Sequence, residues 1–205
     1  MRRLGQSLLL LALAGLLPAC STTRLLEQGE YRLEKNVIEI DGPDADKFRD
    51  PNLESYLRQQ PNSSLVMGWN PLLNVYNWSG RNPDKWINKL VRSLGEAPVV
   101  YDPDMVQVSA DNLKNHLEYL GWFGTEVDAR PDDPKKKRVT VRYKIHLGRR
   151  YPISRIDYDL PTRGTFAADF CADTANVTIR PGSYLSESAL AAESERSARE
   201  MRNRG

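Results

Sequence analysis

The sequence predicts an α+β fold assembled from tandem repeats, each in the order strand, helix, helix, strand, strand. Three adjacent patterns lead to this prediction. Residues 109–121 carry apolar side chains at helical spacing, residues 122–129 carry them at the spacing of a half-buried strand, and residues 138–147 alternate strictly between apolar and polar. A helix followed by two strands therefore forms the second half of the first repeat.

The helix at residues 109–121 is predicted to begin at Ser109, because serine is a favourable N-cap residue. Asp111 then lies in the first turn, where the helix dipole favours a carboxylate. Gly121 is expected to end the helix. One helical face collects three leucines, which are Leu113, Leu117 and Leu120.

Each of the two following strands has one apolar face. On the first strand this face consists of Phe123, Val127 and Ala129. On the second it consists of Val139, Val141, Tyr143, Ile145 and Leu147. Asp132-Asp133-Pro134 is expected to make the turn between the strands. The basic run from Lys135 to Arg138 is expected to be a solvated hairpin tip, and contact with anionic headgroups or an acidic partner is the alternative.

Three shorter segments predict the first half of this repeat. Residues 31–41 are expected to form a strand whose apolar residues are Val37, Ile38 and Ile40. Residues 50–58 are expected to form a short helix capped by Asp50. Residues 85–95 are expected to form an amphipathic helix on which Trp86, Leu90 and Leu94 are spaced by four. The first domain is therefore predicted to span residues 31–148.

An apolar insertion occupies residues 61–83 of this domain. It is denser in large apolar groups than a solvated loop usually is. One interpretation is that the insertion packs on its own domain, because aromatic side chains dominate core energetics. The other is an interface with a partner protein or with the membrane headgroup region. The candidate interface residues are Trp69, Leu72, Leu73, Tyr76 and Trp78.

Residues 149–205 are predicted to begin a second domain of the same kind. Residues 151–158 are expected to form its first strand, and Ser186 is expected to cap a helix that runs to Arg204. The two strands that should follow this helix are absent from the sequence, so the helix lacks the strands over which it would bury its apolar face. We expect these 205 residues to be the N-terminal part of a longer protein.

The N-terminus has the features of an export signal. Arg2 and Arg3 precede an apolar run at residues 8–17 that is too short to span a bilayer permanently. Leu17-Pro18-Ala19-Cys20 then resembles the lipobox of bacterial lipoprotein precursors. We therefore expect a signal peptide at residues 1–19, a lipidated Cys20, and a tether at residues 20–30. An ordinary secretory signal with an incidental cysteine is the alternative.

Charge and motif content limit the classes of function. The chain has 29 Lys+Arg and 27 Asp+Glu, and the predicted signal peptide removes two of the basic residues, so the mature part is formally neutral. A nucleic-acid partner is therefore not expected. His116 and His146 are the only histidines and belong to no metal-binding or nucleophile motif, so we expect no metal, no cofactor and no enzyme activity. Cys171 is expected to be a small buried side chain.

One family resemblance accounts for the order of these elements. The helix ending in Leu120-Gly121-Trp122-Phe123, the two strands, and Gly148-Arg149-Arg150-Tyr151-Pro152-Ile153 resemble the second half of a POTRA repeat joined to the next repeat. POTRA repeats are periplasmic modules that precede the membrane barrel in outer-membrane assembly proteins of the BamA and TamA type. The apolar insertion ending in Tyr76-Asn77 is similar to that of the lipidated TamA-like proteins of Bacteroidetes, called TamL.

The resemblance implies a module that receives unfolded outer-membrane proteins and passes them to a membrane barrel. Strand addition to an open sheet edge would bind such clients with little sequence selectivity. The candidate edges carry Phe123 and Val127 on one strand, and Val37, Ile38 and Ile40 on the other. Ser21 after the cysteine favours the outer membrane by lipoprotein sorting rules, with the domain in the periplasm. The alternatives are a free-standing outer-membrane lipoprotein that acts as a scaffold or adaptor, and an enzyme of unrecognised type. Asp173-Thr174-Ala175 also resembles an O-glycosylation acceptor of Bacteroidetes.

Overall fold

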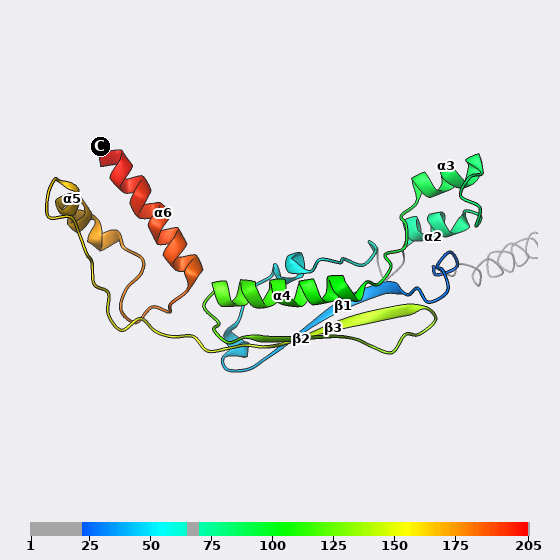
Figure 1. The fold of residues 1–205 in the computed structure, drawn as a ribbon, viewed down its shortest axis with the longest axis horizontal. Helices are drawn as coiled ribbons and strands as arrows, with labels where there is room; N and C mark the ends of the chain where they lie inside the picture. The colour runs from blue at the N-terminus through cyan, green and yellow to red at the C-terminus, as the bar shows by residue number, and fades with distance from the viewer. Residues whose placement is uncertain (1–21, 65–69, 205) are drawn as a thin grey trace, which may run out of the picture. The chain divides into compact units, whose positions relative to one another are not determined.

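A three-stranded sheet and a set of helices make up the fold, as the computed structural model shows for residues 22–64 and 70–204 (Figure 1). The strands are β1 (Arg32–Asp41), β2 (Glu126–Pro131) and β3 (Arg138–His146), in the sheet order β1-β3-β2. The predicted α+β class is confirmed. The α-helices are α2 (Pro71–Trp78), α3 (Trp86–Leu94), α4 (Pro103–Tyr119), α5 (Phe166–Asp173) and α6 (Glu187–Arg204), and the 3-10 helices are η1 (Ala45–Lys47), η2 (Leu53–Tyr56) and η4 (Thr174–Asn176).

The chain divides into two compact units, which are described separately below. Among the described residues, the first unit contains residues 22–37, 59–64, 70–105 and 130–142, and the second contains residues 38–58, 106–129 and 143–204. The first unit therefore includes the α2–α3 hairpin, and the second includes most of α4 together with α5 and α6. Within the described ranges, no helix combines the length and apolar character needed to cross a membrane.

Strand β3 is the central strand of the sheet, and its predicted alternation is confirmed. Its apolar side chains and the leucine that follows are at most 1% exposed, namely Val139, Val141, Tyr143, Ile145 and Leu147. On β1 the fully buried residue is Leu33, whereas the apolar residues named from the sequence, Val37, Ile38 and Ile40, are half-buried. An outer strand has a neighbour on one side only, which leaves more of its length near solvent.

Helix α4 begins at Pro103, so the predicted start at Ser109 is wrong. Asp102 Oδ1 accepts a hydrogen bond from the backbone N–H of Asp104 at 2.9 Å, and proline occupies the first helical position. Ser109 lies in the helix interior, fully buried, and its Oγ accepts a hydrogen bond from the Arg58 N–H at 2.8 Å. The buried face of α4 also extends further back than expected, through Val106, Ala110, Leu113 and Leu117.

The predicted end of α4 at Gly121 is confirmed. Gly121 has a φ of 93°, and its N–H donates to the Glu118 carbonyl at 2.9 Å. The Trp122 N–H donates to the Leu117 carbonyl at 3.0 Å, which completes a Schellman motif. Leu117 and Trp122 are both buried, as the hydrophobic contact of this motif requires.

The β2–β3 hairpin turns at Lys136 and Lys137, not at the predicted Asp132-Asp133-Pro134. The two lysines have φ values of 52° and 58°, and Lys135 and Arg138 exchange both backbone hydrogen bonds at 2.9 Å. A two-residue turn with positive φ at both positions matches the twist of the paired strands. Here two lysines adopt the positive φ that glycine or asparagine usually adopts in such turns. The turn was therefore predicted at the wrong residues, because Asp132-Asp133-Pro134 is the segment with typical turn composition.

Residues 151–158 do not form the predicted strand. Their pairing is limited to the loop before α6, where Ile153 N–H donates to Ser183 O and Leu185 N–H donates to Tyr151 O, each at 2.8 Å. Within the described part of the chain, these residues form one isolated bridge, between Pro152 and Tyr184. Proline cannot donate to a ladder, which limits the pairing at this point. The predicted cap of α6 is confirmed, because Ser186 Oγ accepts from the Ala189 N–H at 3.2 Å.

Candidate binding surfaces

The two outer strands of the sheet, β1 and β2, include most of the residues that were named as candidate edges. Val127 lies on β2 and is half-buried. Phe123 precedes the strand and instead forms an isolated antiparallel bridge with Arg149, with N–H to carbonyl distances of 3.1 and 3.0 Å. The predicted strand 122–129 therefore starts four residues later than expected and ends at Pro131.

The outer side of β1 is partly covered by the connector that precedes α4. Leu33 N–H donates to the Val99 carbonyl, and Tyr101 N–H donates to the Tyr31 carbonyl, each at 2.8 Å. These bonds add a short antiparallel segment beside the start of β1. The candidate residues Val37, Ile38 and Ile40 lie further along β1. The segment at 99–101 therefore covers the start of this edge but not the part that carries the candidate residues.

Helices α2 and α3 form a hairpin (Figure 1), and the most apolar side of α3 is exposed. The pattern of α3 predicts one apolar face, and that face consists of Trp86, Ile87, Leu90 and Leu94. Trp86 is 74% exposed, Leu94 64%, Leu90 51% and Ile87 50%. A surface helix of a globular domain normally buries this side.

The inner side of the hairpin is polar. The Asn88 side chain is buried, and its Oδ1 accepts from the Gly80 N–H at 2.8 Å while its Nδ2 donates to the Asn82 carbonyl at 2.7 Å. The Arg92 guanidinium donates to Ser79 Oγ and to the Gly80 carbonyl, each at 3.0 Å. Buried backbone groups of the loop between the helices need such partners, which is why the polar side of α3 faces inward.

The insertion residues named from the sequence do not share one environment. Leu73 on α2 is fully buried, whereas Leu72 is 48% exposed and Trp78 is 66% exposed. Tyr76 is half-buried, with the Arg92 guanidinium carbon 5.5 Å from its ring centroid. Trp69 lies outside the described residues. Of the insertion residues named from the sequence that the structure describes, Leu73 is a core residue, and Leu72 and Trp78 are exposed apolar side chains.

The residues that follow the predicted lipidation site contact the hairpin. Arg24 Nη2 donates to the Ser79 carbonyl at 3.0 Å, and Asn77 Nδ2 donates to the Thr22 carbonyl at 3.4 Å. Lys137 Nζ donates to the Leu26 and Glu27 carbonyls at 3.2 and 2.7 Å, so one lysine of the basic tip is used within the first unit. Cys20 itself lies outside the described residues.

Arg150 forms a junction that sequence reasoning missed. Its guanidinium carbon lies 5.3 Å from the Trp122 ring centroid and 4.2 Å from that of Tyr184. Trp122 also meets Phe48 edge to face, with centroids 5.8 Å apart. These stacked contacts link the end of the first predicted repeat to the second within one unit. In the sequence, the pair Arg149-Arg150 was the only feature that marked this position. No pattern indicated that Arg150 would contact Trp122 and Tyr184.

The two histidines each contact one carboxylate. His116 Nε2 lies 2.7 Å from Asp50 Oδ2 and its ring stacks on Tyr56, and His146 Nδ1 lies 2.6 Å from Asp41 Oδ1.

Burial raises the pKa of Asp50, but hydrogen bonds from His116 and from the Asn52 N–H outweigh it, so the pKa is lowered overall. Residues 53–56 form the 3-10 helix η2 with Asn52 as its N-cap, so the predicted helix capped by Asp50 is wrong. Asp50 Oδ1 instead accepts from the Asn52 N–H at 2.9 Å, one residue before η2. Among the described residues, no group of three or more acidic, histidine or cysteine side chains could hold a metal ion.

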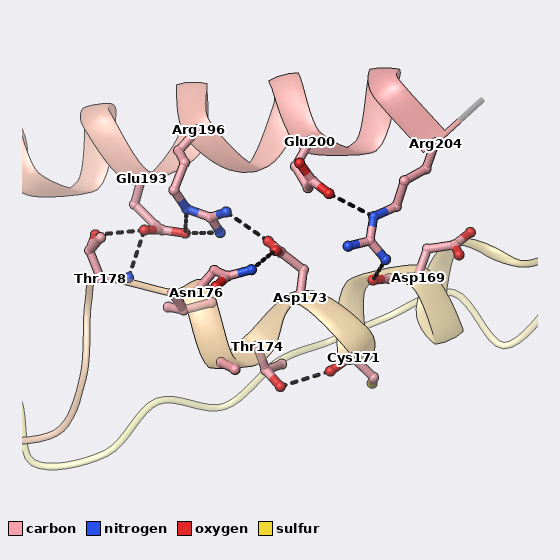
Figure 2. Close-up of polar contacts among 12 residues, drawn as sticks. Asp169, Cys171, Asp173, Thr174, Asn176, Thr178, Glu193, Arg196, Glu200 and Arg204 are labelled. Carbon is pink, nitrogen blue, oxygen red and sulfur yellow. Dashed lines mark hydrogen bonds and ion pairs between the residues drawn. The ribbon is translucent and has the colours of Figure 1, made fainter.

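A polar cluster joins α5 and η4 to α6 in the second unit (Figure 2). Asp173 is 1% exposed and accepts from Arg196 Nη1 at 2.8 Å. Glu193 accepts from Arg196 at 2.7 Å and from the Thr178 hydroxyl at 2.6 Å. The hydrogen bonds from Arg196, with those from Thr178, lower the pKa of Glu193 to about 2 against the opposing effect of burial.

Two sequence expectations fall beside this cluster. Cys171 is exposed, so the predicted burial is wrong. The inward position at this end of α5 is taken by Asp173 instead. The Thr174 side chain is also exposed, and its hydroxyl donates to the Cys171 carbonyl at 2.7 Å (Figure 2). Nothing in these contacts tests glycosylation at Thr174, which stays a prediction.

An apolar cavity of about 770 Å³ lies between the extended segment at 153–158 and helices α5 and α6. Its apolar lining includes Ile153, Phe166, Phe170, Val177, Leu190 and Met201. The apolar side of α6 therefore faces open space, and Leu190 is 48% exposed.

Comparison with known proteins shows that the region containing the sheet matches a protein-family model. The family model described as "POTRA: Surface antigen variable number repeat" matches residues 33–148. The crystal structure of Haemophilus influenzae BamA POTRA3-5 is similar over 82% of this chain and 50% of that chain, at 13% sequence identity and a TM-score of 0.37. The chain thus spans about half the length of that structure. No curated protein matches the sequence.

Proposed function

Because the matched region covers more than half of the sequence, this chain belongs to the POTRA family, and from that premise we propose that it is a periplasmic module of an outer-membrane barrel protein. The module assists the insertion or translocation of outer-membrane proteins. It acts by binding and not by catalysis, because its surfaces offer sheet edges and apolar faces for partners. The single observation that carries the proposal is the POTRA match over the strands of the sheet.

Clients bind by strand addition to β2. An extended segment of an unfolded barrel protein pairs with the backbone of an outer strand, and its alternate side chains meet the flanking residues. Of the two outer strands, β1 already has the segment at 99–101 beside its start. Strand β2 is the other outer strand of the sheet, and Val127 and Ala129 give it a half-buried apolar side. The difference between the edges favours β2.

The module is lipid-anchored and resembles the TamL type. Acyl chains on Cys20 hold the domain at the outer membrane, with residues 1–19 removed and residues 20–30 as the tether. The first domain spans residues 31–148, and the second begins at residue 149. The apolar cavity beside α6 supports a second domain that is completed by further strands, because such strands would cover its lining.

The test of client binding uses photo-crosslinking amino acids at two exposed edge positions. Glu126 lies on β2 and Lys35 lies on β1, and both side chains are exposed. Each variant is incubated with an unfolded outer-membrane barrel protein and irradiated. We expect adducts from Glu126 and few from Lys35, because the client adds to β2.

A third variant, with the crosslinker at exposed Lys114 on α4, reports contacts that do not involve an edge. Equal adducts at Glu126 and Lys114 would contradict strand addition. Adducts at Lys35 alone would move the client to β1, and no adducts at any position would leave a scaffold or adaptor role without client binding.

A further inference from the structure

We propose that the α2–α3 hairpin is a second membrane contact, which lies in the headgroup region of the bilayer that the lipid on Cys20 anchors. This inference rests on the proposed lipid anchor for the position of the bilayer. It assigns a role to the exposed apolar side of α3, which neither the POTRA family nor strand addition at β2 explains. The occupant of this side is an anionic lipid surface.

The composition of α3 is that of an interfacial helix. Its outward side consists of Trp86, Ile87, Leu90 and Leu94, each at least 50% exposed. Helices with one strongly apolar side and one basic side lie in the plane of a membrane interface, with the apolar side in the boundary between headgroups and acyl chains. Tryptophan is favoured at this depth. Trp78, at the end of α2, is 66% exposed and adds a second indole to the hairpin.

The charges of the hairpin fit an anionic surface. Without Arg92, which bonds within the hairpin, positions 81–89 have three basic residues and one acidic residue, although the mature chain as a whole is formally neutral. Arg81, Lys85 and Lys89 are exposed. Basic side chains beside an apolar face reach headgroup phosphates while their aliphatic stems stay near the apolar residues.

The position of the tether brings the bilayer to the hairpin. The Thr22 carbonyl accepts from Asn77 on α2, and Arg24 donates to the Ser79 carbonyl just after that helix. Cys20 precedes Thr22 by two residues, a backbone span of at most about 7 Å. The proposed lipid is therefore attached within that distance of Thr22, whose carbonyl contacts α2. A lipid anchor on Cys20 and an apolar hairpin close to it would contact the same membrane.

The first experiment removes the lipid so that the hairpin acts alone. The chain from residue 20 onward, with Cys20→Ser, is floated with vesicles of phosphatidylethanolamine and phosphatidylglycerol, and with vesicles of phosphatidylcholine. We expect partitioning into the anionic vesicles. Replacing two exposed apolar residues in Trp86→Ser/Leu90→Ser should lower that partitioning by at least about tenfold, because each large apolar side chain contributes strongly to transfer.

A control variant on another helix tests whether membrane binding depends on the hairpin or on exposed apolar side chains anywhere in the protein. Val108 and Tyr119 on α4 are 43% and 39% exposed, so Val108→Ser/Tyr119→Ser removes similar exposed groups from another helix. This variant should float like the unmodified chain. Circular dichroism of all three proteins checks that they are folded. Equal losses in both double variants, or no flotation of the unmodified chain, would overturn the proposal.

The second experiment uses the lipidated protein, so that failure of the anchor and failure of the hairpin contact are distinguishable. Mass spectrometry reports whether Cys20 carries acyl chains, whatever the hairpin does. The blue shift of tryptophan emission on adding anionic vesicles, compared between the chain and Trp86→Phe, reports whether α3 enters the interface. An acylated Cys20 with no blue shift from Trp86 would overturn the hairpin contact alone. A dimer in sedimentation that Trp86→Ser/Leu90→Ser abolishes would also overturn it, because a second copy would then cover this side.

Discussion

Helices α3 and α4 both have apolar residues at helical spacing in the sequence, but the structure exposes this side on α3 and buries it on α4. On α4 the apolar side is buried, with Leu113 and Leu117 fully covered. On α3 the apolar side faces outward, with Trp86 74% and Leu94 64% exposed, while Asn88 and Arg92 make the inward contacts. Periodicity therefore identifies a side that needs covering, and the location of that cover depends on what the chain places nearby.

The largest effect should come from truncating the buried side of α4. Leu117→Ala should destabilise the protein by about 2–5 kcal/mol, because it leaves a cavity in a packed core. Leu94→Ala on α3 should change the free energy of unfolding by less than about 0.5 kcal/mol, as exposed substitutions usually do. Urea unfolding followed by circular dichroism measures both. Similar costs for the two variants would mean that the apolar side of α3 is covered within this chain.

A smaller effect should come from the polar side of α3. Asn88→Ala should destabilise the hairpin by about 1–2 kcal/mol, because it leaves the Gly80 N–H and the Asn82 carbonyl without their side-chain partner. The matched control is Ser93→Ala on the same helix, where an exposed hydroxyl bonds only the Leu90 carbonyl. Hydrogen exchange of α2 and α3 amides reports the local change. An unchanged exchange rate in Asn88→Ala would show that the polar contacts do not orient α3.

The smallest effect should be a pH dependence of the local stability of helix α6. Ion pairs connect α6 to its neighbours, whereas apolar packing stabilises α4. The pKa of Glu193 falls from 4.5 to about 2 in the folded protein, chiefly through hydrogen bonds from Arg196. Because the folded-state pKa is the lower one, this stabilisation is complete above about pH 4.5 and is lost as the pH falls toward 2.

Amide exchange of α6, measured from pH 5 to pH 2.5, should accelerate beyond the intrinsic dependence. Glu193→Gln should be less protected at pH 5 and should lose most of the pH dependence. If Glu193→Gln instead follows the unmodified chain throughout, the cluster of Asp173 and Arg196 does not depend on Glu193.

Most of the sheet could be predicted from the sequence, because its signals are local. The alternation from Val139 to Leu147 specifies a buried side whatever else the chain does. The glycine at 121 ends α4 because a positive φ disfavours other residues there. The start of α4 was missed because Ser109 and Asp102 are both favourable caps, and tertiary contact selected between them: Ser109 is buried against the Arg58 backbone.

The candidate surfaces were predicted less completely. The insertion was recognised as apolar, but its division into buried Leu73 and exposed Trp78 depends on which side of α2 meets α3. The contacts of Arg150 with Trp122 and Tyr184 join residues that are 28 and 34 positions away in the chain, so no local pattern could indicate them. The expected strand at 151–158 had suitable residues, but its pairing in the structure is limited to the loop before α6.

The sequence by itself determined the order of α4, β2 and β3, the buried side of β3, the glycine that ends α4 and the family resemblance, because each depends on residues close together in the chain. Only the tertiary structure decided which helix side is covered, where the hairpin turns, and which edge of the sheet has a neighbour. Those outcomes depend on contacts between residues that are distant in the sequence. The free energies of such contacts cannot be read from the local propensities of the residues. The outward side of α3 is the clearest of them, since its pattern alone would have placed Trp86 and Leu90 in a core.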